Sequence, residues 1–143
     1  KKGRKHLPRM AAFLARTKAA PDWMVSSPAL RAKESAEVVA ESLKLSRPIV
    51  WNQRAYLAPA STLLEILAET PEVVEHAVIV GHNPGMSDLL AGLCAGSDFR
   101  LNVQMSTGGL AIVAAQIVHW HQIRWGCGEL LGYAAPRFLK GLD

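Results

Sequence analysis

The chain has 143 residues, a length that fits one domain, and half of them are apolar while a fifth are charged. The net charge of +4 favours an anionic ligand without identifying one. Two cysteines, Cys94 and Cys127, exclude a disulfide-rich secreted framework and predict a reducing, cytoplasmic compartment. The longest apolar run, residues 110–118, is too short to span a bilayer, so we expect no membrane partner.

Helix and strand signals alternate from the first residues onward. Apolar residues at helical spacing, beginning with Leu7, Met10, Ala11 and Leu14, predict helices around residues 7–14, 36–43, 60–67 and 86–93. Short apolar runs predict strands at residues 23–26, 49–51, 77–81, 110–118, 119–125 and 130–134.

This alternation is typical of an α/β domain, and we predict a three-layer α/β/α fold with a mostly parallel central sheet over residues 1–143. Such a sheet usually has a central strand buried on both faces, whereas the first element here is a helix. We therefore expect that the first strand precedes Lys1 and is missing from this sequence.

Two strand-to-helix turns share one design. In the first, Ser27 can cap a helix and Pro28 suits its first position, where no N–H is needed. In the second, Asn83 can cap and Pro84 opens the helix, directly after His82 at the strand tip. Ligands of α/β sheets gather at the carboxyl ends of strands, where helix N-termini favour phosphate.

Arg31 and His82 are the candidate catalytic and phosphate-binding residues of these turns. Arg31, in the first turn of its helix, can present two N–H groups to phosphate oxygens. His82 can donate to an oxyanion or carry a proton. Taken singly, Arg31 could be a surface arginine and His82 a structural histidine; their shared context favours a site. Ser27, Asn83 and Thr107 either contact the anion or only shape the backbone.

Several stretches also resemble the histidine phosphatase superfamily, the phosphoglycerate mutase-like group. Residues 26–37, SSPALRAKESAE, are similar to the S-S-P-x-x-R-A-x-x-T-A-E stretch of that family, and residues 78–85, VIVGHNPG, resemble its V-x-G-H-N-P-G stretch. Residues 106–111, STGGLA, resemble a later T-G-x-L-A stretch. The short length and the G-H-N-P-G form point to the branch of SixA-type phosphohistidine phosphatases.

The resemblance implies a mechanism without a metal or organic cofactor. A histidine in an N-terminal R-H motif attacks phosphorus, and water then releases phosphate from the phosphohistidine intermediate. Arg31 would be one of two arginines that hold the phosphoryl oxygens, and His82 the second histidine. The substrate would be a phosphorylated protein or a small phosphate ester, handled by a bacterial, monomeric protein that binds no nucleic acid.

Two departures from the family pattern affect this interpretation. No R-H dipeptide occurs, and we do not assign the nucleophile to His6, which precedes a helix rather than ending a strand. The nucleophile is therefore expected upstream of Lys1, and the chain as given is expected to show no turnover. Larger family members also carry an acid where residues 54–60 contain no carboxylate. This absence favours a phosphohistidine substrate, whose leaving nitrogen can already be protonated.

Two other functions remain open at the level of sequence. His119 and His121, on a predicted strand with Cys127 close behind, could bind zinc in a metal-dependent hydrolase. A non-catalytic module could instead hold a phosphorylated partner with Arg31 and His82 and release it unchanged.

Overall fold

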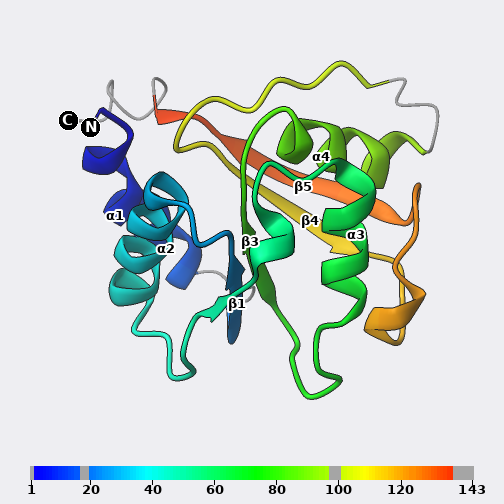
Figure 1. Ribbon diagram of the computed structural model, residues 1–143, viewed down its shortest axis with the longest axis horizontal. Coiled ribbons are helices and arrows are strands. Elements are labelled where there is room, and N and C mark those ends of the chain that lie inside the picture. Colours follow the sequence, from blue (N-terminus) through cyan, green and yellow to red (C-terminus); the bar gives the residue numbers. More distant parts are fainter. Residues whose placement is uncertain (1, 17–19, 97–100, 137–143) are drawn as a thin grey trace.

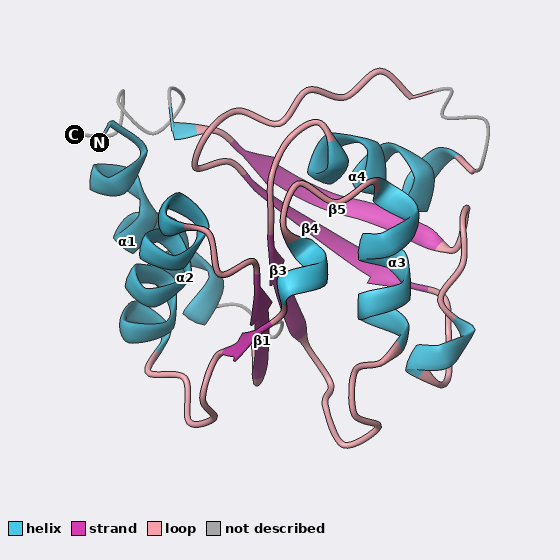
Figure 2. Ribbon diagram, viewed as in Figure 1, coloured by secondary structure: helices cyan, strands magenta, loops and turns pink. Residues whose placement is uncertain are grey.

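The structure is a computed structural model that describes residues 2–16, 20–96 and 101–136, with the backbone alone for residues 2–6. Its helices are α1 (Lys2–Ala15), α2 (Leu30–Leu43), α3 (Ala60–Ala68) and α4 (Gly85–Ala95), with short 3₁₀ helices η1 (Gln53–Ala55) and η2 (Trp120–Gln122). Its strands are β1 (Trp23–Ser26), β2 (Val50–Trp51), β3 (Ala77–Val80), β4 (Leu110–Ala115) and β5 (Gly128–Ala134) (Figures 1 and 2).

Three parallel strands form the sheet that carries the two turns. Their order is β2-β1-β3, with Val25 opposite both Val50 and Ile79. Helices α1 and α2 lie on one side of this sheet, and α3 and α4 lie on the other (Figure 1). The predicted α/β fold, with a parallel sheet between helical layers, is thereby confirmed.

The core forms where the apolar periodicity predicts it. The four residues of the α1 pattern, Leu7, Met10, Ala11 and Leu14, are all buried. On the other side of the sheet, α3 and α4 pack together over Val25, with Leu63 fully buried between them. The helices therefore bury the stripes that their 3.6-residue repeat creates.

The late strands differ from the prediction of one sheet. Strands β4 and β5 form a separate antiparallel pair, with a register shift between Ile112 and Val113. Strand β4 ends at Ala115 rather than at Val118, because the chain turns where the Ile117 N–H donates to the Ala115 carbonyl.

The predicted strand at residues 119–125 is wrong. Its first residues form η2, because the Gln122 side chain accepts hydrogen bonds from the N–H groups of Val118 and His119. The Trp120 indole then anchors this turn by donating to the Val74 carbonyl at 2.8 Å. Local capping has therefore overridden a run of strand-forming side chains.

In the part of the chain that the structure describes, no helix is both long enough and apolar enough to cross a bilayer.

Candidate functional site

The sheet register places the two predicted turns side by side. Ser26 and Val80 are paired at the carboxyl ends of β1 and β3, and the Ser27 N–H donates to the Val80 carbonyl at 3.0 Å. Both strands are parallel, so the residues that follow them leave the same edge of the sheet. This is the edge at which α2 and α4 begin (Figure 1).

A direct hydrogen bond between side chains joins the turns. The Ser27 hydroxyl lies 2.8 Å from Nε2 of His82, and the tautomer of the imidazole decides which group donates. Ser27 is fully buried, and its hydroxyl also accepts from the Ala29 N–H at 3.2 Å. The buried serine therefore fixes the direction in which the His82 ring faces the edge of the sheet.

Arg31 lies in the first turn of α2 and is exposed. The helix begins at Leu30 after Ala29, so Pro28 lies outside it and not at its first position. The bond from the Ala29 N–H to Ser27 takes the place of the expected cap. The structure thus brings Ser27 and His82 into contact, and Arg31 is exposed in the first turn of the helix that follows Ser27.

Both polar atoms of the Asn83 side-chain amide form hydrogen bonds with other residues of the chain. Its Oδ1 accepts from the N–H and the hydroxyl of Ser87, at 3.2 and 2.8 Å, and its Nδ2 donates to the Met105 carbonyl. The Ser87 hydroxyl also accepts from the Met105 N–H at 2.9 Å. Asn83 therefore attaches the loop around Met105 to the beginning of α4, and its predicted contact with phosphate stays a prediction. Thr107, further along this loop, is exposed.

Glycine is required where α4 begins. A Cβ at Gly85 would collide with the carbonyl oxygen of Ala58, and one at Gly81 would lie 3.1 Å from the Met86 sulfur. The close approach at Gly85 brings the loop before α3 next to the His82 turn. Packing thus explains the last glycine of the G-H-N-P-G pattern, whereas at the first glycine only the flexible Met86 side chain would have to move.

Tyr56 is the site residue that the sequence reasoning missed. Its ring meets the His82 imidazole edge to face, with centroids 5.6 Å apart and planes 80° apart. Half of the Tyr56 surface remains exposed. The sequence signal for it is its place in the stretch 54–60, which contains no carboxylate.

Of the three residues of the zinc alternative, only the two histidines lie close together. The rings of His119 and His121 stack with centroids 5.5 Å apart, whereas Cys127 is buried in the core. Nδ1 of His119 lies 2.6 Å from a Glu72 oxygen, and this hydrogen bond lowers the pKa of the Glu72 carboxyl below its usual value. Over the described ranges, no three metal-binding side chains come together.

The chemistry available at the sheet edge suits an oxyanion. Two helices of 14 and 11 residues begin at it, and the N-terminus of a helix carries a partial positive charge. The Arg31 guanidinium on one helix is a charged donor, and the His82 imidazole before the other adds a ring nitrogen. These groups are of the kind that bind a phosphoryl group, and its binding here stays a prediction.

The sequence has uncharacterised relatives. No protein-family model matches it. Two Mycobacterium tuberculosis proteins, one from strain CDC 1551 / Oshkosh and one from strain ATCC 25618 / H37Rv, are each 27% identical to it over 124 residues. That match covers 82% of this chain and 75% of each relative, and both relatives are named as uncharacterized.

The fold is similar to solved structures named SixA. A candidate phosphohistidine phosphatase from Nakamurella multipartitia has a TM-score of 0.77 at 17% identity, covering 95% of this chain and 83% of its own. One from Agrobacterium tumefaciens has a TM-score of 0.73 at 25% identity, covering 93% and 79%. A protein histidine phosphatase SixA complexed with tungstate has a TM-score of 0.76 at 23% identity, covering 95% and 82%.

Proposed function

We propose that the complete protein is a phosphatase that hydrolyses phosphohistidine, or a related phosphomonoester, at the edge formed by the two turns. The hydrogen bond between Ser27 and His82 carries this proposal, because it holds a histidine at a sheet edge where two helices begin. The structural likeness to SixA proteins supports it.

In the proposed reaction, Arg31 and His82 hold the phosphoryl oxygens. A histidine upstream of Lys1 attacks phosphorus, so that a new N–P bond forms while the bond to the leaving group breaks. Water then attacks the same phosphorus and releases inorganic phosphate, which regenerates the histidine. This chain's own residues position the phosphoryl group and neutralise its charge, which is most of what phosphoryl transfer requires.

The surroundings of His82 favour a phosphohistidine substrate. Tyr56 covers one side of the imidazole, and residues 52–60 supply no carboxylate to protonate a leaving oxygen. The imidazole nitrogen released from phosphohistidine accepts a proton readily, so it needs less help from a general acid. An alkyl phosphate would lack this advantage.

The test is phosphate release from a phosphohistidine peptide by the complete native protein. We expect release by the unchanged protein, loss of at least about 100-fold on His82→Ala, and a similar loss on Arg31→Ala. His121→Ala is the matched control, because that histidine lies in η2 beside His119, and it should leave the rate unchanged.

Binding of the same peptide without phosphate release would contradict the proposed hydrolysis and identify a phosphoprotein-binding module instead. Release that survives His82→Ala would place the activity elsewhere in the protein.

A further inference from the structure

The loop of residues 52–58 connects the first turn of the candidate site to the second. At its start, the Asn52 N–H donates to the Ser26 carbonyl at 2.9 Å, where β1 ends. At its other end, the Ala58 carbonyl oxygen packs against Gly85, where α4 begins, so closely that a Cβ on that glycine would collide with it. The loop is therefore held at both turns of the candidate site.

Within this loop the small apolar side chains are buried and the large ones are exposed. Ala55 has no exposed surface and Ala58 only 7%, whereas Tyr56 is 50% and Leu57 63% exposed. Burial normally favours the larger apolar side chains, since the free energy gained grows with the apolar area removed from water. Packing of the core therefore explains the two alanines, but it does not explain the tyrosine and the leucine between them.

The backbone at Leu57 is strained as well. Its φ is 47°, in the left-handed region that leucine rarely adopts. Leu57 follows η1, at a position where the end of a helix commonly carries glycine or asparagine. Strain of this kind is often kept at ligand-binding sites. A ligand contact would account for a leucine that is both strained and exposed.

Tyr56 brings this loop to the candidate site. Its ring meets the His82 imidazole edge to face, with centroids 5.6 Å apart, and half of its surface stays open to a ligand. The charged residue of the loop, Arg54, pairs instead with Glu69 of the α3 end at 2.8 Å. The loop therefore offers the site an aromatic ring and the apolar side chain of Leu57.

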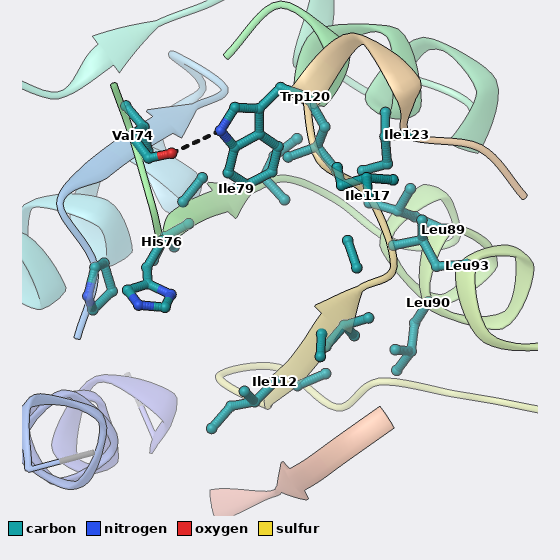
Figure 3. Close-up of a pocket in the computed structure, with 18 of the residues that line it drawn as sticks. Val74, His76, Ile79, Leu89, Leu90, Leu93, Ile112, Ile117, Trp120 and Ile123 are labelled. Carbon is teal, nitrogen blue, oxygen red and sulfur yellow. Dashed lines mark hydrogen bonds between the residues drawn. The ribbon is translucent and has the colours of Figure 1, made fainter. Parts of the chain in front are cut away.

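The apolar cavity between β3 and β4 does not serve a group that is bound beside His82. This cavity has a volume of about 650 Å³, and its walls include Ile79 of β3 and Ile112 of β4 (Figure 3). Neither Tyr56 nor His82 lines it. Apolar contacts for a group attached to a phosphoryl group at His82 therefore come from the loop of residues 52–58.

We propose that Tyr56 and Leu57 determine the specificity of the site by contacting the part of the substrate to which the phosphoryl group is attached. This inference rests on the proposed function, in which Arg31 and His82 hold the phosphoryl oxygens. An exposed ring beside an exposed leucine suits a flat group, which gains from ring stacking and from removal of its faces from water. The ligand class is a phosphoryl group bonded directly to a ring, whether imidazole or aryl, rather than to an alkyl chain or a sugar.

Binding of two phosphonates tests this inference without turnover, because their C–P bond is not hydrolysed. Phenylphosphonate and methylphosphonate carry the same anionic group on a ring or on a single carbon. Each is titrated into the complete native protein, and the backbone amide resonances give each Kd. We expect phenylphosphonate to bind at least about 10-fold more tightly than methylphosphonate, the scale of one aromatic contact.

Variants of Tyr56 assign this preference to its ring. Tyr56→Ala should abolish the preference and leave the Kd of methylphosphonate within about 2-fold of its original value. Tyr56→Phe keeps the ring and should keep the preference. Phe13→Ala is the matched control, because it removes a similarly exposed ring from α1, and it should change neither Kd.

Equal affinities for the two phosphonates, or a preference that survives Tyr56→Ala, would overturn the inference and leave the proposed hydrolysis intact. A loss of both affinities in Tyr56→Ala would also overturn it, since the ring would then act only by supporting His82. A ring preference in a protein that releases no phosphate would support the inference and contradict the hydrolysis. Binding of neither phosphonate at millimolar concentration would contradict both.

Leu57→Asn separates the ligand contact from a role in folding. Asparagine adopts a positive φ more readily than leucine, so the urea midpoint should rise or stay the same. The affinity for phenylphosphonate should nevertheless fall about 3-fold, because apolar contact area is lost. Leu131→Asn, at an exposed leucine of β5, is the matched control and should leave this affinity unchanged. A lower urea midpoint with unchanged affinity in Leu57→Asn would show that Leu57 serves the fold and not the ligand.

Discussion

Ser27 connects the two turns of the candidate site through one hydroxyl. It accepts a hydrogen bond from the Ala29 N–H, forms a hydrogen bond with the His82 ring and is fully buried. A buried hydroxyl without hydrogen-bond partners is unfavourable, so both of these bonds stabilise the folded protein. The residue thus links the geometry of the first turn to the orientation of the imidazole in the second.

We predict that Ser27→Ala lowers the free energy of unfolding by about 1–2 kcal/mol, because the bonds of its hydroxyl to the Ala29 N–H and to His82 are lost. Urea unfolding of the variant measures this effect. Ser61→Ala, at an exposed position in α3, is the matched control and should change stability by less than about 0.5 kcal/mol. A Ser27 variant as stable as the control would show that the hydroxyl does not join the turns.

Gly85→Ala should destabilise the protein by about 1–3 kcal/mol, because its methyl group would enter the space of the Ala58 carbonyl. The measurement is again the urea midpoint. Gly132→Ala is the control, since a Cβ there meets no atom within 4 Å. Similar midpoints for the two variants would contradict the close approach of α4 to the loop before α3.

At the scale of elements, Asp22 ties the start of β1 to the segment before β3. Its carboxylate accepts from the His76 N–H at 2.9 Å and from the Glu75 N–H at 3.2 Å. Partial burial raises the pKa of this carboxyl, but the hydrogen bonds outweigh burial and lower that pKa below its ordinary value of 3.8. The ionised form is therefore favoured by folding.

A lowered pKa in the folded state gives stability that is present above the unfolded pKa and lost as the pH falls through the folded one. We predict that the protein loses this contribution below about pH 3.8. Asp22→Asn removes the titrating group, so its stability should depend less on pH in that range. Urea unfolding from pH 5 down to about pH 2.5 measures the difference between the two proteins. Parallel profiles would contradict the role of Asp22.

The elements nearest the site could be predicted because local signals determine them. A short apolar run bounded by polar turn residues predicts β1 at residues 23–26, the bounds it adopts, and the run at residues 77–81 predicts β3 to within one residue. The positions of α3 and α4 follow from apolar periodicity. Residues 119–125 could not be predicted, because the local Gln122 cap acts together with the bond from Trp120 to Val74, a residue 46 positions away.

The contact between Tyr56 and His82 could not be predicted from the sequence either. Its contact with His82 joins residues 26 positions apart, through a loop whose path is set by the packing of Ala58 against Gly85. The Ser27–His82 contact, in contrast, follows from two similar turns on neighbouring parallel strands. Pairs of matching local motifs are therefore predictable, whereas single side chains carried in by a loop are not.

At the scale of the whole molecule, the candidate site belongs to only one of the two sheets. The parallel sheet of β1, β2 and β3 carries the turns of the candidate site, and β4 and β5 form the separate antiparallel pair. The loop that precedes β4 reaches back to the site through the bond from Asn83 to the Met105 carbonyl.

Titration of the protein with tungstate or inorganic phosphate, followed by the backbone amide resonances, tests the oxyanion site most directly. The account predicts saturable shifts at Ser27, Arg31 and His82, which Arg31→Ala and His82→Ala each weaken at least about 10-fold, as expected for charge-assisted bonds. Shifts confined to other segments, or binding unchanged in both variants, would contradict an anion site at these two turns.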